Sequence, residues 1–275
     1  MRSATVALIA LVVLTGCGSG DEDPSPSAGS TPTGVSTPPG VPTARAVYWL
    51  GATESLQGPR LYREFVARPA VPDPVRDAVE LMLADQPADQ DYTSLWADGT
   101  TVRGVRTEGT TAVVDLSEQA RTNGGGSAFE AATLQQLVHT VTAADPSLTA
   151  VQLLIAGEPV ETLWGSTDAS QPMTRSEAAF TLGPVWLDVP EGGTIDGTFG
   201  GTATVFEATV SWQVRRNDTV VDEGFSTATT GAPGRGEWAA TTDAAPGEYE
   251  LWAFESSAKD GSVTWLDTKN VTVTG

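Results

Sequence analysis

The period of the hydrophobic pattern changes part-way along the chain, and this change constrains the fold more than any other feature. Up to about residue 171, apolar residues recur at helical spacing between short strand-like runs. Later in the chain, apolar and polar residues alternate, and turns that contain glycine or proline interrupt the alternation. A mixture of helical spacing and strand-like runs favours an α+β domain, whereas repeated alternation of apolar and polar residues favours sheets with one buried face. We therefore predict an α+β domain at 45–171 and an all-β domain at 172–275.

Two amphipathic helices are expected in the first domain. Asp73 is suited to cap a helix at 74–84, with Pro74 in its first position. A second helix is expected to begin near Ser127, which forms a capping box with Glu130. The order of helices and strands predicts one mixed sheet with both helices on one face. The expected strands are 47–50, 61–67, 101–107, 111–116 and 150–155.

Short β-prone runs between turn signals fill the second domain. These runs amount to about seven strands in residues 178–275, which is typical of a β-sandwich. Ala208, Val210, Trp212 and Val214 alternate with polar residues, so Trp212 is expected in the core. Tyr249 follows a Pro-Gly turn in the way that places a tyrosine at the corner of an immunoglobulin-like sandwich.

Residues 1–16 have the features of a secretory signal peptide. Arg2 supplies a positive charge, and an apolar run from Ala4 to Leu14 follows it. Such a run is too short to span a membrane, which needs about 20 residues. The ending Leu14-Thr15-Gly16-Cys17 resembles the bacterial lipobox, in which cleavage before the cysteine leaves a lipid-modified thiol. Cys17 is therefore expected to carry the acyl chains, palmitate among them, that anchor the protein, and as the one cysteine it leaves no disulfide.

A polar tether is expected between the anchor and the first domain. In 18–44, Gly, Ser, Thr and Pro fill twenty of the twenty-seven positions. Such a composition cannot bury enough apolar surface to fold, and its prolines favour an extended chain. The range 17–44 is therefore predicted to be the lipidated cysteine and a disordered tether, and the acids at 21–23 to be solvated.

Charge and composition exclude several classes of function. The net charge of −20 opposes binding to nucleic acid. His139 lies off the apolar stripe of the second helix and is expected to be exposed and inert. Asp85, Asp89 and Asp91 satisfy one calcium-loop interval only and are expected to be solvated loop acids. We expect no catalytic residue, no metal site and no cofactor.

Several runs of the first domain, and one of the second, carry a family resemblance. The runs of the first domain are Asp73 to Leu83, Asp98 to Val102, Val113 to Ser117, Leu134 to Leu137 and Val151 to Gly157. Together they resemble the GerMN domain of spore-germination-type bacterial proteins, although Ala97 replaces a usual proline. The run Glu255 to Ser262, with the strand that ends at Val273, is similar to the immunoglobulin-like domain that accompanies GerMN. The resemblance implies an envelope-associated protein with no known catalytic residues.

Tryptophans of the second domain are the candidates for binding. Aromatic side chains on a sheet can stack on sugar rings or anchor a protein partner. Trp252 is out of phase with Tyr249, Leu251 and Ala253, so it is expected on the other face of the sheet together with Phe254. The alternative is that Trp252 packs in the ordinary way, including against the first domain.

These features predict a non-enzymatic, lipid-anchored binding or scaffold protein on the extracytoplasmic face of the cell membrane. The expected partner is an envelope protein. The expected contacts are the sheet edge of the first domain, which could pair with a strand of another chain, and the aromatic face formed by Trp252 and Phe254. Each domain has a net charge of −9, with eight bases and seventeen acids in 45–171 and six bases and fifteen acids in 172–275. The partner's face should therefore be neutral or basic. The alternatives are an envelope carbohydrate- or peptidoglycan-binding module, or an accessory to a peptidoglycan-acting enzyme.

Overall fold

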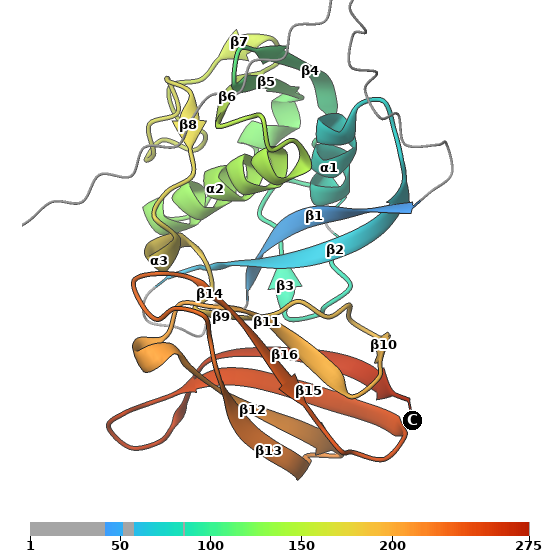
Figure 1. Cartoon of the computed structure of the whole chain (residues 1–275). Coiled ribbons are helices and arrows are strands. Elements are labelled where there is room, and N and C mark those ends of the chain that lie inside the picture. The colour runs from blue at the N-terminus through green and yellow to red at the C-terminus, as the bar shows by residue number, and fades with distance from the viewer. Residues whose placement is uncertain (1–41, 52–57, 85, 275) are drawn as a thin grey trace, which may run out of the picture. The chain divides into compact units, whose positions relative to one another are not determined.

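The computed structural model describes residues 42–51, 58–84 and 86–274 (Figure 1), which belong to one compact unit, Pro38–Gly275. The predicted signal peptide, Cys17 and nearly all of the tether lie outside the described residues. No helix in the described ranges is both long enough and apolar enough to cross a membrane.

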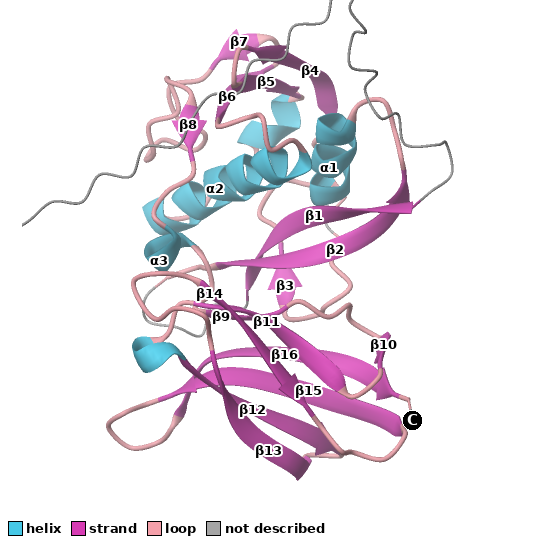
Figure 2. Cartoon of the chain, in the orientation of Figure 1, coloured by secondary structure: helices cyan, strands magenta, loops and turns pink. Residues whose placement is uncertain are grey.

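The strands of the first domain form two sheets (Figure 2), whereas the sequence predicted one. The first sheet has the order β2-β1-β3, and all its strands are antiparallel. The second has the order β4-β5-β6-β7, with β8 also paired to β6, and it is mixed because β5 and β6 are parallel. The strands are β1 (Pro42–Gly51), β2 (Leu61–Pro69), β3 (Tyr92–Thr93), β4 (Val102–Glu108), β5 (Thr111–Leu116), β6 (Ala150–Ile155), β7 (Glu158–Pro159) and β8 (Met173–Thr174).

Side chains of the long helix α2 (Ser127–Ala144) bond to the edge of β1 that faces away from β2. The backbone N–H of Tyr48 in β1 donates to Thr140 Oγ1 at 3.2 Å. The carbonyl of Tyr48 accepts from Gln136 Nε2 at 2.9 Å. The helix therefore satisfies backbone groups of β1 that a strand of the second sheet would otherwise pair with.

The helices confirm one predicted cap and contradict the other. In α1 (Pro74–Leu83), Asp73 Oδ1 accepts from the backbone N–H of Arg76 at 2.9 Å, as predicted. Helix α2 has Gly126 as its N-cap, so the capping box is wrong. Glu130 is fully buried, and its carboxylate accepts from two backbone N–H groups of a distant loop. The short helical elements are η1 (Glu118–Arg121), α3 (Ala178–Thr181) and η2 (Phe206–Ala208).

The second domain is a β-sandwich, as the sequence predicts. One sheet has the order β10-β16-β15-β12-β13 and the other has the order β14-β11-β9. The hydroxyl of Tyr249 donates to the carbonyl of Ala245 at 2.8 Å, which is the predicted tyrosine corner. The strands are β9 (Val185–Leu187), β10 (Gly193–Ile195), β11 (Thr198–Ala203), β12 (Thr209–Arg216), β13 (Thr219–Thr227), β14 (Gly236–Thr241), β15 (Gly247–Ser256) and β16 (Val263–Val273).

Two hydrophobic cores meet at β9. Successive side chains of a strand point to opposite faces. Val185 and Leu187 pack in the core of the sandwich, whereas Trp186 packs in the core of the first domain. Trp186 is 2% exposed, and its Nε1 donates to the carbonyl of Leu61 at 3.1 Å. The fold is therefore α+β followed by an immunoglobulin-like sandwich, with one strand shared between their cores.

Candidate functional site

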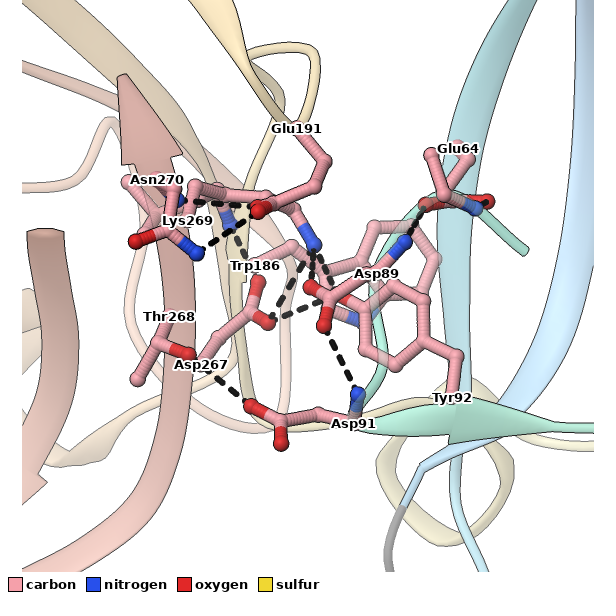
Figure 3. Close-up of polar contacts among 12 residues, drawn as sticks. Glu64, Asp89, Asp91, Tyr92, Trp186, Glu191, Asp267, Thr268, Lys269 and Asn270 are labelled. Atoms are coloured by element: carbon pink, nitrogen blue, oxygen red, sulfur yellow. Dashed lines mark hydrogen bonds and ion pairs between the residues drawn. The ribbon is translucent and has the colours of Figure 1, made fainter.

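A buried polar cluster lies where β16 contacts the loop before β3 (Figure 3). Lys269 is 1% exposed, and its ammonium group pairs with the carboxylate of Asp89. The same ammonium group donates to the hydroxyl of Tyr92 at 2.8 Å. That hydroxyl in turn donates to Asp267 Oδ1 at 2.6 Å. The cluster thus joins charged side chains of the two domains in a continuous network.

Burial governs the ionisation of this cluster. It raises the pKa of Asp267 to about 6, while Lys269 and the hydrogen bond from Tyr92 act in the opposite direction. It also raises the pKa of Tyr92 well above its usual value. Asp89 and Asp267 expose only 4% and 3% of their surface. A substrate in solvent cannot reach groups that are buried to this degree, so the arrangement suits a structural role.

Polar and aromatic contacts around the cluster extend the join between the domains. Arg63 in β2 binds Asp188 with two hydrogen bonds from Nη2, at 2.7 and 2.8 Å. The ring of Tyr62 stacks on that of Tyr92 with the centroids 5.2 Å apart. The backbone of Gly183 lies against the ring of Tyr62. A Cβ atom at residue 183 would come within 2.5 Å of that ring, so the close contact requires glycine. The contacts of Tyr62 with Gly183 and of Arg63 with Asp188 come from consecutive residues of β2 and hold it beside the second domain.

A groove of about 290 Å³ runs along β2 and begins at the Arg63–Asp188 pair. Residues 63–67 form one side and residues 188–191 the other, while Gln86 and Ala88 complete the lining. Phe65 is 41% exposed in this groove, a high fraction for a phenylalanine. The guanidinium carbon of Arg63 lies 4.6 Å from the centroid of the Phe65 ring. The groove therefore offers an apolar surface beside charged groups.

His139 is buried, so the prediction of an exposed side chain is wrong. It is 2% exposed, and its ring lies 5.1 Å from that of Tyr48. Neither ring nitrogen has a hydrogen-bond partner among the residues that the structure describes. Burial, together with the charges of Arg175 and Arg235, lowers the pKa of His139 to about 3. The helix is buried over most of its circumference, which a single apolar stripe did not reveal.

The loop acids differ in their environments. Asp89 belongs to the buried cluster, so the prediction that it is solvated is wrong. Asp91 is exposed, and one of its oxygens accepts from Thr268 Oγ1 at 2.9 Å. Asp85 lies outside the described residues. Among the described residues, no group of three histidine, cysteine or acidic side chains could hold a metal ion.

Trp252 and Phe254 lie in β15 opposite residues of β12. The register places Trp252 opposite Gln213 and Phe254 opposite Ser211. Trp252 is half-buried, and the guanidinium carbon of Arg215 lies 4.2 Å from its ring centroid. Phe254 is 6% exposed, so most of its ring is already covered within the chain. Of this pair, Trp252 retains the larger accessible surface.

Sequence reasoning missed Lys269, although the strand pattern contained a signal. Asp267 and Lys269 have the same phase as Val271 and Val273, which are buried. Two opposite charges on the buried phase of a strand indicate an internal ion pair. The identity of their partners could not be inferred, since Asp89 lies 180 residues away in the sequence.

Two family models match consecutive parts of the chain. Residues 46–161 match the Germane model, described as sporulation and spore germination. Residues 185–262 match Gmad2, the immunoglobulin-like domain of bacterial spore germination. No curated protein is a significant match to the chain.

Solved structures with partial similarity include three from bacterial proteins. A putative lipoprotein from Clostridium perfringens is 19% identical, with a TM-score of 0.35, and the match covers 48% of this chain and 87% of that one. The first GerMN domain of the sporulation protein GerM from Bacillus subtilis is 20% identical, with a TM-score of 0.40, over 48% of this chain and 98% of that one. The tandem GerMN domains of GerM are 18% identical, with a TM-score of 0.41, and the match covers 67% of this chain and 58% of that one.

Proposed function

We propose that this chain, which combines a Germane domain with the immunoglobulin-like domain of bacterial spore germination, is a non-enzymatic, lipid-anchored binding protein of the cell envelope. Its lipid would be attached at Cys17, and its folded domains would lie on the extracytoplasmic face of the membrane. Its action would consist of holding a protein partner, without a chemical step.

The observation that carries this proposal is that the charged groups of the buried cluster are inaccessible and bond the two domains to each other. Lys269, Asp89 and Asp267 are the kinds of groups that general acid and base catalysis requires. All three are 4% exposed or less, and their hydrogen bonds join the two domains. A cluster that holds domains together in this way supports a rigid binding body.

The tether supports an anchored position. An extended segment of 18–44 could hold the domains up to about 80 Å from the bilayer, at about 3 Å for each residue. Two acyl chains on Cys17 would bind the membrane far more strongly than one chain, whose attachment is marginal. The chain could thus reach a partner that projects from the same membrane.

The distribution of tryptophans favours a protein partner over a sugar. A sugar-binding platform needs exposed aromatic faces. Trp186, Trp212 and Trp238 are 8% exposed or less. Arg215 already lies over the ring of Trp252. A half-buried tryptophan beside an arginine is better suited to anchoring a protein interface.

A Cys17→Ala variant tests the anchor. In cells that express the full chain, the wild type should be cleaved before residue 17 and should carry a diacylglyceryl adduct on its first residue. Cys17→Ala should lack both, because the thiol is the attachment atom. Mass spectrometry of the N-terminal peptide and membrane fractionation provide the measurement, and Ser19→Ala serves as the matched control. Normal cleavage and full membrane attachment of Cys17→Ala would contradict the proposal.

A further inference from the structure

The outer edge of β2 presents backbone groups at the groove. Gly51 N–H donates to the carbonyl of Arg60 at 2.9 Å, which makes these residues a hydrogen-bonded pair of the antiparallel ladder. Hydrogen-bonded and non-hydrogen-bonded pairs alternate along such a ladder. Arg63, Phe65 and Ala67 therefore fall at non-hydrogen-bonded positions. Their N–H and C=O groups point away from β1.

Contacts at the start of β2 agree with this alternation of outward-pointing and inward-pointing backbone groups. Leu61 has the same phase, and its carbonyl accepts from Gly183 N–H at 2.8 Å and from Trp186 Nε1 at 3.1 Å. An isolated bridge also joins Leu61 to Leu182. Within the described part of the chain, no further strand pairs with this edge of β2. The edge is thus covered at its beginning and open along the groove.

The groove supplies side-chain selectivity beside the open edge. Its ionisable lining residues are one base, Arg63, and three acids, Glu64, Asp188 and Glu191. Arg63 is engaged by Asp188. Glu64 accepts from the backbone N–H groups of Ala88 and Asp89, and Glu191 accepts from the backbone and side-chain N–H groups of Asn270. These donors are neutral, so the lining keeps a net negative charge. Phe65 provides an apolar surface in the same lining. An occupant that carries apolar and basic side chains would complement this lining.

We propose that the open edge of β2 binds an extended, basic segment of a partner protein, which adds a strand beside Arg63, Phe65 and Ala67. This inference rests on the proposed function, because it names a surface, apart from Trp252, through which the anchored protein holds its partner. Backbone hydrogen bonds supply affinity in strand addition, and the neighbouring pockets supply specificity. The wall formed by residues 188–191 would enclose the added strand on its second side.

Charge and composition argue against two other occupants. The segment 18–44 contains three consecutive acids and several prolines, which cannot donate backbone hydrogen bonds. A second copy of the chain would carry the same net charge of −20 to an acidic groove. A basic partner meets neither obstacle.

A proline at residue 67 tests the backbone contact. Ala67 is exposed, and its N–H points away from β1, so Ala67→Pro removes an outward donor without removing a bond of the ladder between β1 and β2. Ala67→Ser keeps the donor and serves as the matched control. Thermal unfolding of both variants of the full chain establishes that each is folded before binding is measured.

The probe is a labelled peptide of alternating lysine and valine, seven residues long, and fluorescence anisotropy measures its binding. We expect saturable binding to the full chain and to Ala67→Ser, and at least a tenfold weaker affinity for Ala67→Pro. A peptide in which glutamate replaces lysine should also bind at least tenfold more weakly. Equal binding of the lysine peptide to Ala67→Pro and Ala67→Ser would overturn the inference, as would equal binding of the two peptides.

Hydrogen exchange of the chain without peptide provides a second measurement. The amides of Phe65 and Ala67 should exchange rapidly and become protected when the lysine peptide is added. Protection in the absence of peptide would show that the chain itself or a second copy fills the edge, and would overturn the inference. The proposed function fails separately: a cellular partner that is still captured by Ala67→Pro would leave that function intact and move the contact elsewhere.

Discussion

Buried polar residues determine how this protein differs from what its sequence predicts. Glu130, His139 and Lys269 are each 2% exposed or less. Glu130 and Lys269 have hydrogen-bond partners in distant segments, 34 and 180 residues away in the case of Trp164 and Asp89. Hydrophobic periodicity assigns such residues to the surface, because it takes no account of partners from distant segments. His139 lacks a partner on either ring nitrogen among the described residues, and its burial therefore has a consequence for stability.

Replacement of His139 by leucine should remove an acid-dependent loss of stability. The pKa of His139 is about 3 in the folded chain and about 6.5 in the unfolded chain, so below pH 6.5 the unfolded state binds the additional proton. Stability contributed by the neutral ring is thus complete above pH 6.5 and is lost progressively as the pH falls towards 3. At pH 4.5 the loss amounts to about 2 to 3 kcal/mol.

Denaturant unfolding of the wild type and His139→Leu at pH 7 and pH 4.5 measures this effect. Leucine has a similar volume and does not titrate, so the variant should gain stability relative to the wild type as the pH falls. The comparison cancels the pH dependence of groups that both proteins share. A difference in unfolding free energy that is the same at both pH values would contradict the assignment.

Secondary-structure elements were predicted best where a local signal determined them. Asp73 and Pro74 marked the start of α1, and the alternation around Trp212 identified a core strand. The capping box predicted for Glu130 is wrong, because a glutamate at this position can equally be a buried carboxylate with distant hydrogen-bond partners. The division of the first domain into two sheets goes with tertiary hydrogen bonds that no local pattern encodes: Tyr48 N–H donates to Thr140 Oγ1, and Gln136 Nε2 donates to the carbonyl of Tyr48.

The candidate binding edge shows the same limit at the scale of a strand. A strand near 61–67 was predictable from its composition, and the edge of a sheet could be named as a possible contact. Which side of β2 stays open depends on its register with β1 and on the position of residues 188–191. These are tertiary properties, so the groove beside Phe65 emerges only from the fold.

At the scale of the whole molecule, the buried cluster couples the two domains. Replacement of Lys269 by methionine should leave the carboxylate of Asp89 buried without its cation. Breaking a buried pair in this way costs about 3 to 5 kcal/mol. The chain provides a matched control in Lys259, its one other lysine, which is exposed in a loop. Lys259→Met should change the unfolding free energy by about 0.5 kcal/mol or less.

Chemical denaturation of both lysine variants measures this coupling. Addition of Asp89→Asn to Lys269→Met should recover part of the lost stability, because it removes the unpaired charge while its side-chain oxygen can still accept from the N–H of Asp91. Equal stability of Lys269→Met and Lys259→Met would show that the cluster does not hold the domains together.

Site-specific photo-crosslinking in cells is the most direct test of the claim that this protein works by holding a partner. A photoreactive amino acid at Phe65 in the lipid-anchored chain should crosslink to one defined envelope protein. The same amino acid at Glu108, the exposed last residue of β4, should not do so. Two crosslinking results would count against a binding role: identical products from both positions, or no product from Phe65. If either result came together with loss of the cellular phenotype when a single exposed carboxylate is changed, it would contradict the binding role and favour an enzymatic one.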